Sequence, residues 1–63
     1  MKVEVIDIDM DINIKTYMNV IRLETDPDTM TCKVSYVSGE FDHPIKHDLI
    51  KVGPNDTNRV VIY

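Results

Sequence analysis

Apolar and polar residues alternate strictly near the start of the chain. Apolar side chains occupy every second position from Ile6 to Ile14, with Asp or Asn between them. A period of two places the apolar side chains on one face of a β-strand. A helix here would be rich in β-branched residues and Asp, which are mediocre helix formers. We therefore predict a strand over residues 6–14. Val3 and Val5 lie on the opposite phase, which predicts a β-bulge near Val5 and Ile6.

Two further strands are expected to pair as a hairpin. Residues 17–24 carry apolar side chains on both phases, and the alternation resumes from Met30 to Tyr36. Between them lies Thr25-Asp26-Pro27-Asp28, where the proline fixes φ and the flanking Asp side chains can accept hydrogen bonds from nearby backbone N–H groups. This segment therefore predicts a turn, and the strands on either side should be antiparallel neighbours.

The last third of the chain is less regular. Pro44 cannot donate a hydrogen bond within a central strand, so residues 40–43 and 46–51 read as short strands, with a helical turn beginning at Pro44 as the alternative connection. Segments 38–40 and 53–56 predict turns, and residues 59–63 predict a final strand. Short strands with no crossover helix predict an all-β domain, namely a small five-stranded antiparallel SH3-like barrel.

One stretch of the sequence resembles a known class of barrel. The segment Val-Ser-Tyr-Val-Ser-Gly-Glu at 34–40, followed by Pro44, Leu49, Ile50 and Val52, is similar to small SH3-like barrels of the Tudor and KOW kind. The resemblance covers about the last half of the chain. Such families bind peptides, modified side chains or nucleic acid on an open barrel face, so the resemblance implies a binding module.

Length and cysteine content limit how the fold is stabilised. The 63 residues allow one core, so we expect a single domain over residues 1–63. The one cysteine, Cys32, excludes an internal disulfide, and no cluster of cysteine and histidine has the spacing of a structural metal site. We expect Cys32 to act as a small buried hydrophobe, and His43 and His47 to lie on the surface. Stability must come from packing, to which a second chain could contribute.

Composition gives expectations about location and origin. Acidic residues from Glu4 to Asp11 interrupt the apolar run that a signal peptide needs, and the longest apolar run, 60–63, is far shorter than the roughly 20 residues that span a bilayer. We therefore expect a cytoplasmic protein. Ile and Asp are abundant, while Ala, Gln and Trp are absent. This bias would suit an AT-rich bacterial or phage genome.

The row Asp7, Asp9 and Asp11 is the most distinctive candidate interaction feature. On a strand these carboxylates would share one face at a spacing of about 6.6 to 6.8 Å. That spacing is similar to the spacing of phosphates, so the row could imitate a nucleic-acid backbone. The alternative is a solvated strand face that keeps an edge from pairing with other chains. A calcium loop would need Gly and Glu where the chain has Ile12 and Met18.

Aromatic residues form the second candidate interaction feature. Tyr17, Tyr36 and Phe41, with Tyr63, are the only aromatics and could gather on one rim of a barrel. Ordinary core and strand packing is the alternative.

Function follows mainly from what the sequence lacks. It contains no Gly-rich phosphate loop, nucleophile elbow or triad pattern, so we expect no catalysis, no cofactor and no metal. Its basic residues are scattered and its net charge is −4, which disfavours direct nucleic-acid binding. We expect a non-enzymatic module that docks a strand edge or barrel face onto a protein partner, with a second copy of itself among the candidates. The alternative is an acidic inhibitor that mimics nucleic acid.

Overall fold

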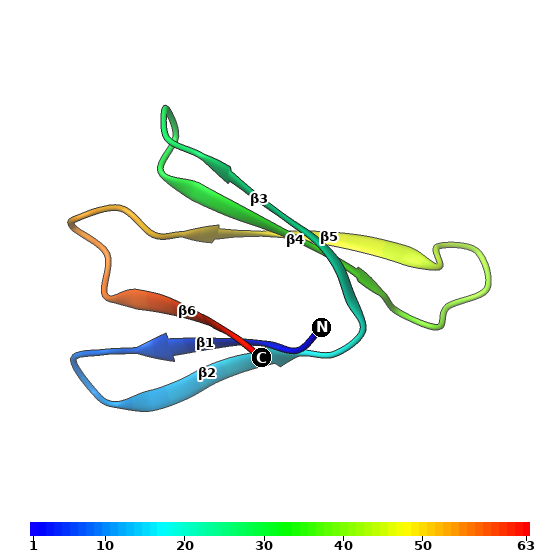
Figure 1. Ribbon diagram of the computed structural model, residues 1–63, viewed down its shortest axis with the longest axis horizontal. Coiled ribbons are helices and arrows are strands. Elements are labelled where there is room, and N and C mark those ends of the chain that lie inside the picture. Colours follow the sequence, from blue (N-terminus) through cyan, green and yellow to red (C-terminus); the bar gives the residue numbers. More distant parts are fainter.

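The computed structural model describes all 63 residues and contains six antiparallel strands and no helix. The strands form two three-stranded sheets, ordered β2-β1-β6 and β3-β4-β5 (Figure 1). The structure therefore has no helix that is long and apolar enough to cross a membrane. The strands are β1 (Val3–Asp7), β2 (Ile12–Tyr17), β3 (Val20–Asp26), β4 (Thr31–Val37), β5 (Ile45–Lys51) and β6 (Asn58–Ile62).

One hydrophobic core lies between the two sheets. The central strands β1 and β4 supply its most deeply buried side chains, Val3 and Val34, because a central strand is covered on both edges by its neighbours. Partly buried side chains from β3 and β6 pack around this core. The buried hydrophobic residues are Val3, Val5, Tyr17, Val20, Cys32, Val34 and Ile50.

The β-bulge predicted near Val5 and Ile6 is confirmed. Val5 lies opposite Lys15 and Ile6 lies opposite Asn13, so Ile14 is the extra residue on β2. Because the extra residue is on the partner strand, it shifts the β1–β2 pairing by one residue and leaves the alternation along β1 itself unbroken.

The predicted strand over residues 6–14 is wrong. It is a hairpin in which β1 ends at Asp7 and β2 begins at Ile12. The Asp7 Oδ1 atom accepts hydrogen bonds from the backbone N–H groups of Asp9 and Met10, and Asp11 has a φ of 54°. Apolar residues within the loop continue the two-residue alternation although they are exposed, so the pattern hides the turn.

The hairpin predicted on either side of Pro27 is confirmed. Leu23 of β3 lies opposite Val34 of β4. The Asp26 Oδ1 atom accepts hydrogen bonds from the N–H groups of Asp28 and Thr29, as the turn chemistry of Asp predicts. The β1–β2 and β3–β4 loops therefore both follow an Asp whose side chain accepts hydrogen bonds from two backbone N–H groups.

The five-stranded barrel with a helical turn near Pro44 is not what the structure shows. There are six strands, and β6 pairs only with β1 while β3 pairs only with β4, so the sheets do not close into a barrel. Residues 40–43 form no strand, and β5 begins directly after Pro44. The Pro44 carbonyl accepts the Ser38 N–H at the entrance of β5, a position where the missing N–H of proline is tolerated.

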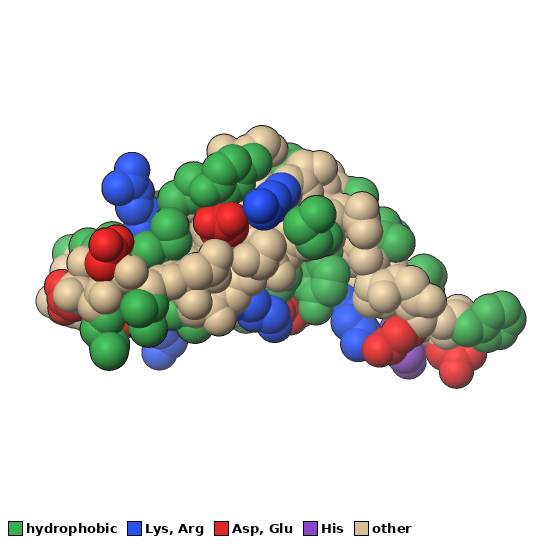
Figure 2. Space-filling view, turned by 90° about the horizontal axis from the view of Figure 1, so that it is seen from below, with side chains coloured by type: hydrophobic (Ala, Val, Ile, Leu, Met, Phe, Trp, Pro, Cys, Tyr) green, Lys and Arg blue, Asp and Glu red, His purple; other side chains and the backbone are tan.

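The molecule is less compact than is usual for a protein of its mass. Its surface of 4635 Å² exceeds the about 4,200 Å² expected for a compact monomer of 7.3 kDa. Its radius of gyration of 12.1 Å likewise exceeds the expected value of about 11 Å. In the view of Figure 2, apolar side chains form separate patches along the length of the molecule, among charges of both signs. Much apolar surface is thus left uncovered.

Candidate functional site

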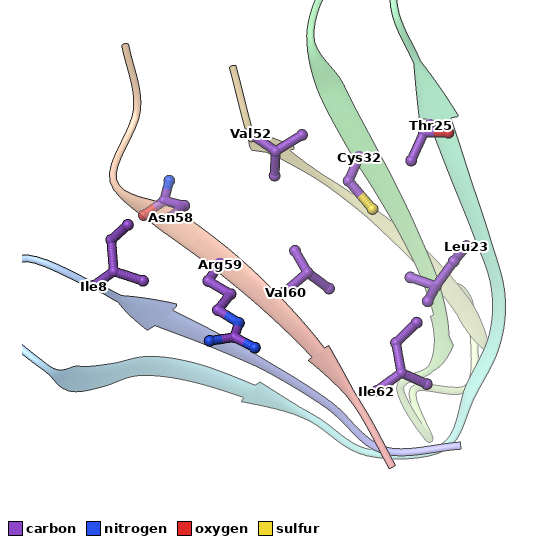
Figure 3. Close-up of a pocket in the computed structure, with 9 residues that line it drawn as sticks. All are labelled: Ile8, Leu23, Thr25, Cys32, Val52, Asn58, Arg59, Val60 and Ile62. Carbon is purple, nitrogen blue, oxygen red and sulfur yellow. The ribbon is translucent and has the colours of Figure 1, made fainter. Parts of the chain in front are cut away.

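A hydrophobic cavity separates β6 from the inner face of β3 and β4. Its volume is about 580 Å³. Figure 3 shows Val60 and Ile62 pointing from β6 toward Cys32 and Leu23 on the opposite sheet. We call this cavity the β3–β6 groove. Its hydrophobic lining residues are Ile8, Leu23, Cys32, Val52, Val60 and Ile62, and its polar ones are Thr25, Asn58 and Arg59.

Strand register directs the side chains into the groove. Val60 lies opposite Val5 and Ile62 lies opposite Val3, and both partners belong to the core. Directly opposed residues share a face of an antiparallel sheet, so Val60 and Ile62 point inward too. Leu23 points inward for the same reason, because it is opposite the buried Val34.

Two free strand edges border the β3–β6 groove. β3 and β6 each hydrogen-bond with one neighbouring strand only, and no side-chain hydrogen bond or ion pair joins them to each other. Free edges present backbone N–H and C=O groups to which another strand can pair. The site therefore combines apolar side-chain contacts with backbone hydrogen-bonding capacity.

On the opposite side of the molecule, polar side chains connect β2 of one sheet to β5 of the other. The Tyr17 hydroxyl of β2 donates to Asp48 Oδ2 of β5 at 2.8 Å, and Lys15 Nζ donates to the same oxygen at 3.0 Å. Burial, reinforced by the bond to Asp48, raises the pKa of Tyr17 to about 12. The Tyr17 hydrogen bond and the Lys15 ammonium lower the pKa of Asp48. These three residues fasten β2 to β5, and the cavity beside them, about 310 Å³, is smaller than the β3–β6 groove.

The aromatic residues do not form one surface patch. Tyr17 and Tyr36 are in contact, with ring centroids 5.2 Å apart and ring planes tilted by 55°. Tyr17 is 5% exposed and belongs to the core, whereas Phe41 is 98% exposed in the loop between β4 and β5. Tyr63 lies elsewhere, beneath the Lys2 ammonium and bonded to Glu4. The aromatic residues therefore do not gather on one rim, and only Tyr17 and Tyr36 are in contact with each other.

The expected row of three carboxylates does not form. Asp7 ends β1 and caps the loop, while Asp9 and Asp11 lie within the loop. Their carboxylates do not share a strand face, because the chain reverses direction between them. The geometry on which nucleic-acid mimicry depended is absent.

Cys32 and the two histidines lie as expected from the sequence. Cys32 is buried, and burial raises the pKa of its thiol. His43 and His47 are exposed, and they lie in the β4–β5 loop and in β5. His47 Nδ1 is 2.7 Å from Ser35 Oγ, but neither residue lines a cavity. No three His, Cys, Asp or Glu residues gather as metal ligands.

The groove residues were not singled out from the sequence, although a signal was present. The strand predicted over 17–24 and the final strand were the ones with apolar residues on both phases. A strand that is apolar on both faces has more surface to cover than one side of a small core can take. These two segments overlap β3 and β6, the strands that border the groove.

Comparisons of the chain with protein-family models, with curated proteins and with solved structures found no match.

Proposed function

We propose that the protein is a non-enzymatic binding module that takes up an extended segment of a protein partner at the β3–β6 groove. The supporting observation is the coincidence, on one side of the molecule, of an apolar cavity with two unpaired strand edges. An added strand gains main-chain hydrogen bonds from such an edge, and alternate side chains enter the adjoining pockets.

The chemistry of the groove defines the segment that it would accept. Its lining is mainly aliphatic, so the inward side chains of the segment should be aliphatic or aromatic. Side chains at every second position of an added strand would point into the groove, and the others would point to solvent. The preferred sequence is therefore an alternating apolar and polar peptide of strand length.

A displayed library of seven-residue peptides tests this function. Binders should be enriched in alternating apolar residues, and they should shift the NMR amide signals of β3 and β6. Val60→Gln should weaken binding about tenfold or more, because it places an amide in the apolar lining. Ile62→Gln, at a more exposed groove position, should weaken binding in the same direction.

Val61→Gln is the matched control. It makes the same change on the same strand, but Val61 is opposite Glu4 and so faces away from the groove. Its peptide affinity should equal that of the wild type. If no peptide binds, or if Val60→Gln and Val61→Gln weaken binding equally, the groove is not the binding site.

We also propose a finer description of the fold, as an opened relative of small SH3-like barrels. Its support is that hairpin-connected antiparallel strands curl around one core in two three-stranded sheets. A closed barrel would continue its backbone hydrogen bonding at two places where this structure does not, between β3 and β6 and between β2 and β5, and side chains bridge only the second.

A further inference from the structure

We propose that a second copy of this chain docks along the free edge of β3, antiparallel to it, with Leu23 of each copy at the two-fold axis. This inference rests on the proposed function, because it names the partner on the β3 side of the same site. The two β3 strands would join the β3-β4-β5 sheets of both copies into one six-stranded sheet.

Charge complementarity along β3 identifies the partner. Arg22 and Glu24 share one face of the strand, with Arg22 Nε 2.8 Å from Glu24 Oε1. Both side chains are exposed. In an antiparallel pair centred on Leu23, Arg22 lies opposite Glu24 of the second copy, and Glu24 lies opposite its Arg22. Two opposite-charge pairs therefore form by symmetry, and such cross-strand pairs stabilise a sheet.

The neighbouring strand extends this charge pattern. Glu24 already lies opposite Lys33 of β4. In the joined sheet Glu24 would lie between Lys33 of its own chain and Arg22 of the second copy, so that charges alternate across three adjacent strands. On the inner face the two Leu23 side chains would meet, and they would cover part of the apolar groove lining.

The other edge strands are less suited to pairing with a second copy. On β5, Lys46 and Asp48 flank His47 with a similar spacing, but Lys46 is bonded to Glu40 of the preceding loop and Asp48 to Lys15 of β2. β6 has a single charged residue, Arg59, and no acidic residue with which a second copy could pair it. On β2 and β5, Lys15 and Asp48 are already bonded to each other. On β3, by contrast, Arg22 and Glu24 form an ion pair only with each other, so β3 is the edge strand whose paired charges are not bonded to another element.

The open shape supports an additional chain. The surface of 4635 Å² is larger than the about 4,200 Å² of a compact monomer of this mass. Ile21, on β3 itself, is 55% exposed. Docking along β3 would cover part of this excess apolar surface.

Sedimentation equilibrium of the full chain with paired charge reversals tests the inference. Wild type should dimerise. Arg22→Glu places four acidic groups at the two-fold axis and Glu24→Arg places four basic ones, so each variant alone should dissociate at least about tenfold more readily. An equimolar mixture of the two variants should form a heterodimer, and the double variant R22E/E24R should recover homodimers.

Circular dichroism checks that the exposed substitutions leave the fold intact, and the double variant keeps the test valid if one single variant unfolds. A wild-type monomer at high concentration overturns the inference, as does a dimer that responds to neither reversal. If the chain is monomeric while alternating peptides still bind in a Val60-dependent manner, the proposed function stands and the occupant of the edge is a peptide. If neither dimer nor peptide binding is found, the proposed function fails as well.

Discussion

Tyr17 joins the two sheets through a single hydroxyl group. Its ring lies in the core against Tyr36, and its hydroxyl reaches Asp48 on the other sheet. The Lys15 ammonium bonds the same carboxylate and lies 4.9 Å from the centre of the Tyr17 ring. Because the hydroxyl is a donor to an ionised acceptor, its bond stabilises the fold more than a neutral pair would.

Tyr17 should make the protein sensitive to alkaline pH. Its pKa is about 12 in the folded state and about 10 when unfolded, so its contribution is complete below pH 10 and is lost as the pH rises through 12. Urea unfolding should show a loss of roughly 3 kcal/mol over this range. Tyr17→Phe should cost about 2 kcal/mol at neutral pH, as expected for a hydrogen bond to a charged group, and should remove this dependence. A variant that keeps the same alkaline slope would contradict the assignment.

The loops of the hairpins β1–β2 and β3–β4 have the same hydrogen-bonding pattern although their sequences differ. In each, an Asp at the end of the first strand accepts two backbone N–H bonds, from the residues two and three positions later. In each, the last loop residue, Asp11 or Met30, has a φ of 54°. The left-handed conformation is costly for a side chain as large as Met, so the surrounding loop must hold it there.

The capping aspartates should contribute equally to stability. Asp7→Ala and Asp26→Ala should each lower the free energy of unfolding by about 1 kcal/mol, because each leaves two backbone donors without their side-chain acceptor. The effects should add in the double variant, since the loops belong to different sheets. Urea titrations measure both. Asp7→Asn retains the Oδ1 acceptor and should lose little, whereas a loss equal to that of Asp7→Ala would show that charge matters instead.

These hairpins also show what the sequence could reveal. The β3–β4 turn was predictable because Pro27 interrupts the alternation. The phase change between Val5 and Ile6 indicated where the pairing of β1 shifts, but not that the extra residue, Ile14, lies on β2. The β1–β2 turn was hidden because Ile8 and Met10 sit at loop positions that continue the strand pattern. The groove could not be predicted as a site, because it forms only when β3, β4 and β6 come together from distant parts of the chain.

At the scale of the whole molecule, two sheets share one small core and are fastened along one side only. The Lys15, Tyr17 and Asp48 cluster joins β2 to β5, while β3 and β6 border the groove. The free energy of folding for so small a core is limited. Any chain that fills the groove should therefore also stabilise the fold.

Thermal stability should depend on protein concentration. If a second copy docks on β3, mass action favours the folded dimer, and the Tm of the wild type should rise by several degrees over a wide concentration range. The Arg22→Glu variant should show a constant Tm. Differential scanning calorimetry at several concentrations measures both. A wild-type Tm that does not change would argue against self-association.

The pairing of β1 with β6 brings the two ends of the chain side by side, as Figure 1 shows. Five of the six strands can meet as local hairpins, but the contact of β6 with β1 joins residues almost the full chain length apart. Contacts of high sequence separation require a long loop to close before they contribute energy, and they slow folding. The hairpins should thus assemble early, and the docking of β6 against β1, which also completes one wall of the groove, should be the slow final event.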